Sequence, residues 1–313
     1  MLTVLVATRN RAEILREVLE GFCHLQQPSS GWKLIVVDNG STDQTTQVVA
    51  SFAERLPLHS VSEPKLGKNL ALNTGLGLVE GNLTVFTDDD IFPHPDWLIK
   101  LREAADSQPA YSMFGGPIVP RWEAPPPRWV QWVETPGPVY GITEPSLKEG
   151  PIISWFIFGG NMAIRTSVLQ SGIRFDTAMG PRGSSYPIGG ETDFVMRLER
   201  QGHKAWHVQG AVVEHLVQEA QLNKTWVLQR AIRFGRGQYR LNNKHEIANA
   251  KLWMGTPPYL LREILKEGLS VTAAWVSFRQ EALFRSRWRF NFRRGQATEA
   301  RILARELPRA LLG

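Results

Sequence analysis

The sequence contains a single cysteine, Cys23, among its 313 residues. One thiol excludes an internal disulfide framework, so we expect a reducing compartment and a buried, structural role for this side chain. No apolar run approaches the roughly 18 residues that a membrane-spanning helix requires. The apolar start of the chain meets Arg9 and Arg11 too early to form the core of a signal peptide. These absences predict a chain that is soluble or attached to a surface.

Acidic residues are scarce in the last third of the chain. Residues 220–313 hold 18 Lys and Arg but only 6 Asp and Glu, whereas the whole chain has a net charge of +6. The same region mixes aromatic residues with arginine, most densely from Trp275 to Phe292. Its apolar residues follow helical spacing in pieces, so we expect residues 219–313 to form a helical, basic C-terminal region after a domain over residues 1–218. An excess of one charge points to an anionic partner.

Apolar runs of strand type alternate with helical patterns through the first hundred residues. The expected strands are Leu2–Ala7, Leu34–Val37, Leu58–Val61 and Leu83–Phe86. The expected helices are Ala12–Phe22 capped by Asn10, a helix capped by Ser41 and Gln44 that runs to Arg55, and Asn69–Val79. Strands that are apolar on both faces and separated by helices predict an α/β fold with a Rossmann-like, mostly parallel sheet flanked by helices.

Prolines crowd the middle of the sequence between Pro117 and Pro138, together with three tryptophans. Because proline breaks regular structure, we expect a long surface loop there. Further along, the sequence predicts a helix from Gly190 to Gln201 and strand-like runs at Ala205–Val208 and Val212–Val213.

Three consecutive carboxylates, Asp88, Asp89 and Asp90, are the strongest chemical signal in the sequence. They follow the last expected strand, and parallel sheets bind ligands outside the carboxyl ends of their strands. Adjacent carboxylates repel one another, and a divalent cation such as Mg²⁺ or Mn²⁺, bound through oxygen atoms, would neutralise them. The alternative is a solvated acidic turn that caps the helix at Trp97. His215, later in the chain, is either a metal or phosphate ligand or a structural residue.

Other polar residues stand at comparable positions. Thr8 and Arg9 follow the first expected strand, and Asp38 ends the second, where an acidic residue binds a base or ribose or stabilises a turn. Glu191 stands at the start of an expected helix, where a carboxylate serves as a general base or as a helix cap. Asp193 is a second acid in the same turn.

Taken in order, seven segments resemble the inverting family-2 glycosyltransferases, whose nucleotide-sugar-binding domain has the A-type fold. The segments are Val4–Asn10, Leu34–Asp43, Gly67–Gly75, Val85–Pro93, Gly159–Arg165, Gly189–Gly202 and His215. They span about residues 1–216. Each motif is loose alone, but their order is specific.

The resemblance implies an enzyme that moves a sugar from a nucleoside diphosphate donor to an acceptor hydroxyl with inversion. Thr8, Arg9 and Asp38 would hold the nucleoside. Lys68 would lie near the nucleotide.

The resemblance also implies a place for the metal. Asp88 and Asp90 match the outer members of the family's Asp-x-Asp motif, with Asp89 between them on the donor side. Asp90 would bind the Mn²⁺ or Mg²⁺ that bridges the two phosphates. His215 matches a late histidine that approaches the metal or the diphosphate.

The position of the general base departs from the family pattern. The family base lies in a Glu-Asp pair shortly before a helical arginine. Counting back from Arg197, Glu191 falls at the second acid of that pair, and Gly190 replaces the first. The base is therefore Glu191 or Asp193, and we favour Glu191.

Two other functions compete with this interpretation. A nucleotidyltransferase that makes nucleotide sugars usually has a glycine-rich signature near its start, and Thr8–Arg11 contains no glycine. A non-enzymatic protein could bind nucleic acid through the basic, aromatic region, but the sequence contains no recognised nucleic-acid module.

The basic C-terminal region favours an anionic membrane surface over nucleic acid. Tryptophan and phenylalanine suit the headgroup layer of a membrane, and arginine suits anionic lipid. We therefore expect a cytoplasmic protein and favour its peripheral attachment to the inner face of the membrane; the alternative is a C-terminal region that is solvated or packed on the rest of the chain. A saccharide or lipid-linked saccharide is then the expected acceptor.

Overall fold

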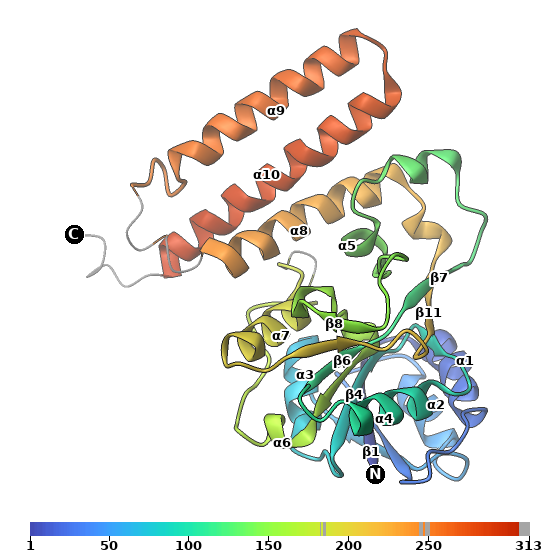
Figure 1. Ribbon diagram of the computed structural model, residues 1–313. Coiled ribbons are helices and arrows are strands. Elements are labelled where there is room, and N and C mark those ends of the chain that lie inside the picture. The colour runs from blue at the N-terminus through green and yellow to red at the C-terminus, as the bar shows by residue number, and fades with distance from the viewer. Residues whose placement is uncertain (182, 184–185, 244–246, 248–250, 307–313) are drawn as a thin grey trace. The chain divides into compact units, whose positions relative to one another are not determined.

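The computed structural model describes residues 1–181, 183, 186–243, 247 and 251–306 (Figure 1). These residues form two compact units. The first unit comprises Met1–Arg121, Tyr140–Thr177 and Gly190–Leu216. The second comprises Trp122–Val139 and the described parts of Ala178–Gly189 and Val217–Gly313. The assignment of residues 1–218 to a catalytic domain and of residues 219–313 to a separate region stays a prediction.

An eight-stranded sheet forms the centre of the first unit, in the order β3-β2-β1-β4-β9-β6-β10-β8. Its strands are β1 (Leu2–Thr8), β2 (Trp32–Asp38), β3 (Leu58–Ser62), β4 (Leu83–Asp88), β6 (Met113–Gly115), β8 (Gly150–Ile152), β9 (Met162–Arg165) and β10 (Ala205–His207). β1 to β4 are parallel, whereas β9 runs antiparallel to β4 and β6, and β8 runs antiparallel to β10. The predicted mostly parallel sheet is confirmed, and β1 to β4 are the four strands expected from the sequence.

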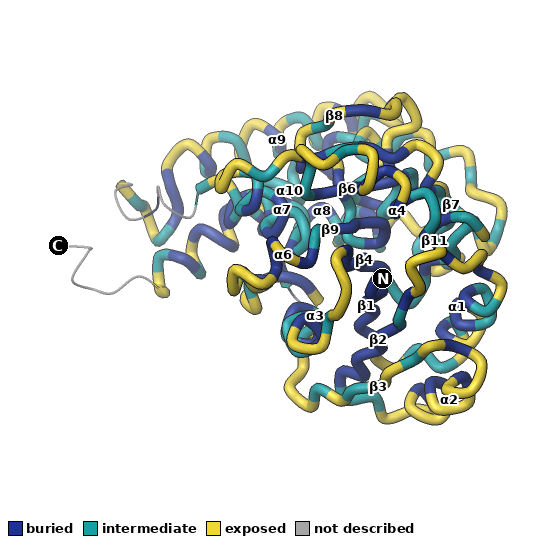
Figure 2. The backbone as a smooth tube through the Cα atoms, turned by 60° about the horizontal axis from the view of Figure 1, so that its bottom comes forward, coloured by how far each residue is buried: buried dark blue, intermediate teal, exposed yellow. Residues whose placement is uncertain are grey.

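Helices pack on both faces of this sheet. They are α1 (Ala12–Cys23), α2 (Thr45–Ser51), α3 (Lys68–Leu76), α4 (Trp97–Ser107), α6 (Thr166–Leu169) and α7 (Gly190–Arg200). In β1, Leu2, Val4 and Val6 belong to the core under α1, α2 and α4, whereas Leu5 and Ala7 belong to the core under α3 and α7. Because successive side chains of a strand point to opposite faces, a strand covered on both sides is apolar throughout. Figure 2 shows β1 as buried along its length.

The side-chain caps expected for α1 and α2 are wrong, whereas the start of the first helix at Ala12 is as expected. α1 begins at Ala12 without a side-chain capping hydrogen bond, and α2 likewise has none. Asn10 has a left-handed backbone, with φ of 52°, and its Oδ1 accepts a hydrogen bond from the Thr42 N–H. Ser41 Oγ accepts a hydrogen bond from the Asn10 N–H. The expected caps therefore join two loops to each other, and α2 ends earlier than expected.

A second sheet of three strands, in the order β5-β11-β7, lies next to the end of β4. Its strands are β5 (Ile91–Pro93), β11 (Val213–Val217) and β7 (Ile118–Trp122). β11 pairs antiparallel with β5 and places His215 opposite Ile91. Since Ile91 directly follows Asp90, this pairing brings a histidine from far along the chain to the acidic turn.

The proline-rich segment is not the long surface loop expected from its composition. It contains β7, the 3-10 helix η1 (Arg128–Trp132) and α5 (Pro136–Tyr140). Pro127 precedes the first turn of η1, and Pro136 is the first residue of α5. At a helix start the missing N–H of proline would have had no partner within the helix, so proline is tolerated there.

Three long helices form most of the described second unit. They are α8 (Lys224–Asn243), α9 (Pro258–Val276) and α10 (Gln280–Glu306), with α10 in contact with both others (Figure 1). The helical C-terminal region is confirmed, and a turn between Val276 and Gln280 separates α9 from α10 within the stretch rich in aromatic residues and arginine. No helix within the described ranges combines the length and apolar composition that crossing a membrane requires.

A close backbone approach and a buried ion cluster hold α8 against α10. A Cβ atom added at Gly295 would lie 2.1 Å from the backbone oxygen of Ile232. Glu299 is fully buried and accepts hydrogen bonds from the Nε atoms of Arg236, at 2.8 Å, and Arg240, at 2.5 Å. The two helices therefore require glycine at their contact and a carboxylate between the two arginines.

We expect Gly295→Ala to lower the free energy of unfolding by about 1–3 kcal/mol, which is the usual cost of overpacking. Gly268→Ala in α9 is the matched control, because a Cβ atom there would meet the Phe290 ring at an ordinary 3.6 Å. Alanine is favoured over glycine inside a helix by about 1 kcal/mol, so the control keeps or gains stability. Urea unfolding of the full chain measures both variants. Equal stability of Gly295→Ala and the unsubstituted chain would contradict the packing of α8 on α10.

Candidate active site

Three carboxylates and their neighbours gather at the carboxyl ends of the parallel strands. β1 pairs with β2 so that Thr8 lies opposite Asp38, and β4 runs beside β1 as far as Asp88. Asp89 and Asp90 continue into the turn before β5. The structure therefore brings the ends of β1, β2 and β4 together at one edge, where ligands of parallel sheets bind.

Lys68 joins the acidic turn to α7. Its Nζ lies 2.6 Å from Asp88 Oδ1 and 2.6 Å from Glu191 Oε1. Burial would lower the pKa of Lys68, but the two carboxylates outweigh this effect and hold the pKa above its usual range. Burial raises the pKa of Asp88, and the charge of Lys68 opposes that rise. One ammonium group thus connects a residue of the acidic turn with the favoured base.

Asp89 and Asp90 have different partners. Thr8 Oγ1 donates a hydrogen bond of 2.7 Å to Asp89 Oδ2. Burial and the charge of Asp90 raise the pKa of Asp89 to about 7, although Arg11 and Thr8 oppose the rise. Burial would also raise the pKa of Asp90, but His215 and Arg11 outweigh it and hold the pKa below its usual range. Asp90 is therefore the aspartate of the turn whose negative charge its surroundings favour.

His215 faces Asp90 with one ring nitrogen and is held by the other. Its Nδ1 lies 2.5 Å from the carbonyl oxygen of Tyr140. A carbonyl only accepts hydrogen bonds, so Nδ1 carries the proton. Nε2 lies 3.5 Å from Asp90 Oδ1. Burial lowers the pKa of His215, but Asp90 outweighs it and the pKa is raised.

The turn and His215 fit a divalent cation that is shared with a phosphate-bearing ligand. A histidine that donates one ring N–H to a carbonyl is oriented to bind a metal with the other nitrogen. Mg²⁺ commonly takes one or two carboxylates and completes its shell with phosphate oxygens and water. Within the described ranges, no group of three or more His, Cys, Asp and Glu side chains is arranged to hold a metal. The ligand set of Asp88, Asp90 and His215 therefore stays a prediction.

Asp38 is held within its own loop. Its Oδ1 accepts a hydrogen bond of 3.0 Å from the Ser41 N–H, and its Oδ2 accepts one of 2.6 Å from the Thr46 hydroxyl. Arg9 is exposed, whereas Thr8 and Asp38 are buried. The three residues lie at the same edge of the sheet, and their roles toward a nucleoside stay predictions.

Asn39 positions the loop that leads to Lys68. Its Nδ2 donates hydrogen bonds to the carbonyl oxygens of Glu63 and Lys65, and its Oδ1 accepts one of 2.7 Å from the Gly67 N–H. Gly67 has φ of 145°, a conformation that side-chain-bearing residues rarely adopt. This positioning role involves contacts 24 to 28 residues away, so the sequence showed only that a polar residue follows a buried strand.

The two acids in the first turn of α7 have different partners. Glu191 binds Lys68, whereas Asp193 Oδ2 accepts a hydrogen bond of 2.8 Å from Arg197 Nε. Two positions along a helix rotate a side chain by about 200°. Of these two acids, Glu191 is the one that the structure joins to Asp88.

Two glycines make room for this arrangement. A Cβ atom at Gly159 would lie 2.4 Å from Glu191 Cγ, and one at Gly190 would lie 2.5 Å from Asn69 Nδ2. The second contact gives a physical reason for glycine at position 190, where the family pattern implies an acid.

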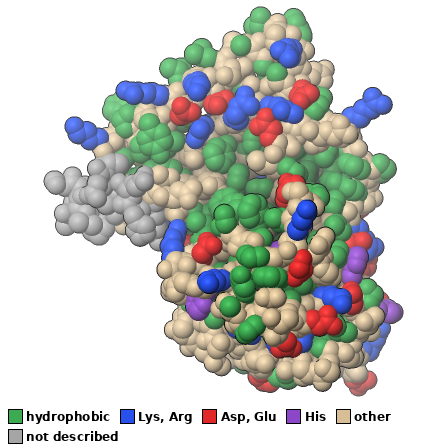
Figure 3. Space-filling view, in the orientation of Figure 1, with side chains coloured by type: hydrophobic (Ala, Val, Ile, Leu, Met, Phe, Trp, Pro, Cys, Tyr) green, Lys and Arg blue, Asp and Glu red, His purple; other side chains and the backbone are tan. Residues whose placement is uncertain are grey.

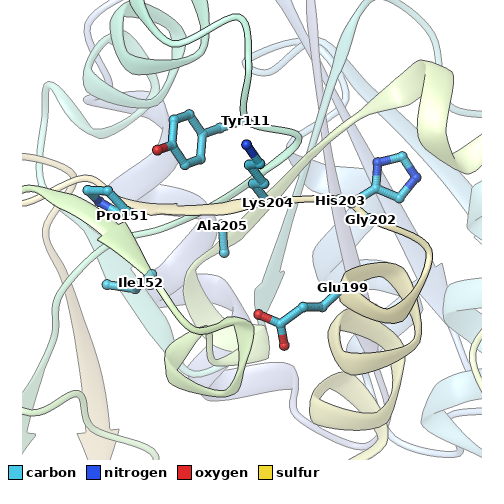
Figure 4. A pocket seen from close by; sticks show the side chains of 8 residues that line it. All are labelled: Tyr111, Pro151, Ile152, Glu199, Gly202, His203, Lys204 and Ala205. Carbon is cyan, nitrogen blue, oxygen red and sulfur yellow. The ribbon is translucent and has the colours of Figure 1, made fainter.

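A hollow of about 270 Å³ lies elsewhere in the first unit (Figure 4). Its lining includes Tyr111 and Lys204, which precede β6 and β10. Both strands run in the direction of β4, so the hollow lies at the opposite edge of the sheet from the acidic turn. Glu199 in its lining accepts hydrogen bonds from the N–H and hydroxyl of Ser154. This hollow is therefore separate from the candidate active site.

Two curated relatives align with most of the chain. The glucosyl-dolichyl phosphate glucuronosyltransferase of Haloferax volcanii is 24% identical over 227 residues, which cover 71% of this chain and 70% of that protein. The succinoglycan biosynthesis protein ExoM of Rhizobium meliloti is 26% identical over 239 residues, which cover 75% of this chain and 73% of that protein.

A solved structure has a similar fold. The mannosyltransferase PcManGT from Pyrobaculum calidifontis, in complex with GDP-Man and Mn²⁺, superposes with a TM-score of 0.63 and 18% sequence identity. The superposition covers 95% of this chain and 86% of that chain. The glycosyltransferase A-type fold implied by the sequence motifs is confirmed.

The family match covers the strands that carry the carboxylates. Residues 3–172, more than half of the chain, match Glycosyl transferase family 2. They include β1 to β4 and the turn from Asp88 to Asp90. The chain therefore belongs to glycosyl transferase family 2.

Proposed function

We propose that this protein transfers a sugar from a nucleoside diphosphate sugar to an acceptor hydroxyl with inversion, using a divalent cation at the acidic turn. The observation that carries the proposal is the joining of Asp88 to Glu191 by Lys68, beside Asp90 and His215. A carboxylate of the acidic turn, a cationic side chain and the proposed base thus meet at the carboxyl ends of the parallel strands. The GDP-Man complex of the structural relative supports this class of donor.

The donor would be held between the strand ends and the start of α3. Thr8, Arg9 and Asp38 would bind the nucleoside. Lys68 would meet the negative phosphates, which would compete with Asp88 and Glu191 for its ammonium group. Arg11, whose Nη2 lies 3.8 Å from Asp90 Oδ2, adds a second cationic group near the phosphates.

Asp90 and His215 would hold the Mn²⁺ or Mg²⁺, with Asp88 as a further carboxylate when Lys68 turns toward the phosphates. When bound, such an ion stabilises the negative charge that grows on the leaving diphosphate. Asp89 would stay on the donor side of the turn through its hydrogen bond with Thr8.

Glu191 would act as the general base of a single displacement. The acceptor oxygen bonds to the anomeric carbon from the face opposite the diphosphate, as the bond from that carbon to the phosphate oxygen breaks. The hydroxyl proton passes to Glu191, whose carboxylate is free to accept it once Lys68, its partner before the donor binds, has turned toward the phosphates. Asp193 is the alternative base, but Arg197 engages its carboxylate.

The relatives support an acceptor that is a saccharide or a lipid-linked saccharide. One relative is named for glucosyl-dolichyl phosphate, and the other for succinoglycan biosynthesis. We therefore place the reaction in the assembly of a surface polysaccharide or glycolipid on the cytoplasmic side of a membrane. The basic C-terminal region would face the anionic membrane surface.

We expect Glu191→Gln to reduce turnover by about 10²–10⁴-fold, the usual contribution of a general base, while donor binding is retained. Nucleoside diphosphate release from a panel of nucleotide sugars with Mn²⁺ measures turnover, and calorimetry measures donor binding. Release of pyrophosphate in place of a nucleoside diphosphate would support a nucleotidyltransferase.

Asp193→Asn is the matched control for this assignment, because it alters a carboxylate of the same helical turn. It should keep turnover within about tenfold of the unsubstituted enzyme, since the Asp193–Arg197 pair is a local contact within the helix. The opposite pattern, with Glu191→Gln active and Asp193→Asn inactive, would assign the base to Asp193.

We expect Asp90→Asn to remove the metal-dependent part of nucleoside diphosphate binding. In the unsubstituted protein, replacing Mn²⁺ with a chelator should weaken binding by about tenfold or more, whereas the variant should bind equally under both conditions. Asp106→Asn, at an exposed carboxylate of α4 paired with Arg102, should behave like the unsubstituted protein. Binding by the unsubstituted protein that does not change with the chelator would argue against a metal at this turn.

A further inference from the structure

α9 carries an apolar stripe on its exposed face. Leu265, Leu269 and Val276 are 67%, 65% and 62% exposed. Their spacing of four and seven residues places them on one side of the helix. Isolated exposed apolar residues are ordinary on protein surfaces, but an aligned row marks a surface that binds a partner.

Two exposed aromatic rings lie beside this stripe, Trp275 in the last turn of α9 and Phe278 in the turn that follows the helix. Trp275 is 65% exposed and Phe278 is 91% exposed. Phe278 also has φ of 54°, in the left-handed region that bulky side chains avoid. A strained backbone that projects a bare aromatic ring into solvent is unfavourable for the chain alone, and such outliers cluster at functional positions.

The basic side chains of α9 are exposed, whereas its acidic side chains pair with α10. Arg262 and Lys266 are exposed, and Arg279 follows the exposed Phe278. Glu263 and Glu267 instead form ion pairs of 3.3 Å and 3.1 Å with arginines of α10. Figure 3 shows hydrophobic side chains beside basic ones on the helical part of the molecule, with acidic side chains among the basic ones. The exposed charges on this side of α9 are therefore positive and accompany apolar groups.

We propose that this surface, which we call the hairpin face (Leu265, Leu269, Trp275, Val276 and Phe278), lies in the headgroup layer of an anionic membrane. Aromatic and aliphatic side chains enter the boundary between headgroups and acyl chains, and exposed arginine and lysine side chains meet anionic lipid. The hairpin face is thus the part of the C-terminal region that would contact the membrane. This proposal does not depend on the transfer reaction, because membrane binding is measured without donor or acceptor.

The charge pattern favours a membrane over a second copy of the chain. In a two-fold symmetric dimer the same patch lies on both sides of the interface. Such a dimer would gather the exposed Arg262 and Lys266 side chains of both copies at one interface, and an excess of like charge there opposes association. An anionic lipid surface instead complements both the apolar and the basic groups.

Flotation of the full chain with lipid vesicles tests the proposal. At low salt, the unsubstituted protein should float with vesicles of phosphatidylcholine and phosphatidylglycerol and much less with phosphatidylcholine alone. The double variant Trp275→Ala/Phe278→Gly should lose about tenfold or more in apparent affinity, because two rings no longer enter the membrane. Glycine adopts the left-handed conformation readily, so the substitution at position 278 removes strain and does not endanger folding.

Trp253→Ala is the matched control. Trp253 is 64% exposed, as Trp275 is, but it lies before α9, at the other end of this helix. The control should bind vesicles as the unsubstituted protein does.

Three results would overturn the proposal. The double variant could bind vesicles as well as the unsubstituted protein does, or the unsubstituted protein could fail to bind anionic vesicles at low salt. The third is a concentration-dependent dimer that the double variant abolishes, because it would assign the hairpin face to a second copy. Vesicle binding as expected, without transfer from any nucleotide sugar, would instead count against the proposed function alone.

Discussion

The compensation of three adjacent carboxylates is the constraint on which the candidate active site depends. Unpaired charges so close together repel strongly, most of all where water is partly excluded. Each aspartate of the turn has its own partner: the ammonium of Lys68 at the start of α3, a hydroxyl at the end of β1, and the imidazole of His215 in β11. These partners come from separate parts of the chain, so the turn exists in this form only in the folded first unit.

The same balance of charge explains how donor and metal would bind at the acidic turn. Lys68 binds Asp88 and Glu191 at once, and so connects a carboxylate of the acidic turn to the proposed base. A diphosphate carries negative charge to this ammonium, and a divalent cation carries positive charge to the aspartates. In the proposed function, the donor phosphates therefore replace Asp88 and Glu191 as partners of Lys68, and the metal replaces Lys68 as the partner of Asp88.

The fold could be predicted from the sequence where the pattern is local. β1, β2 and β4 are largely apolar on both faces, which is the pattern of strands covered by helices on both sides of a sheet. The position of Asp88 at the carboxyl end of β4 could be predicted from the apolar run before it, and parallel sheets bind ligands at that end of their strands. The capping positions Asn10 and Ser41 could not be predicted, because these side chains bind each other's loops. The sequence predicted helical pieces in the C-terminal region but not the position of the turn after Val276, because aromatic and basic residues continue across it.

The contacts of the candidate site could not be predicted either, because they join residues that are far apart in the sequence. Lys68 and Glu191 are 123 residues apart, and no local spacing reveals that they meet. Arg11 lies beyond the end of β1, where no pattern separates it from an ordinary surface arginine. The resemblance to the family supplied Lys68 and His215 as candidates, and the structure shows which aspartate each of them contacts.

An anomalous-scattering map of crystals grown with Mn²⁺ and a nucleoside diphosphate would test the central claim most directly. The account predicts a manganese peak beside Asp90 Oδ1 and His215 Nε2, with the diphosphate in contact with Lys68. Nucleotide bound elsewhere, with no metal at the turn and Lys68 still bridging Asp88 and Glu191, would contradict it.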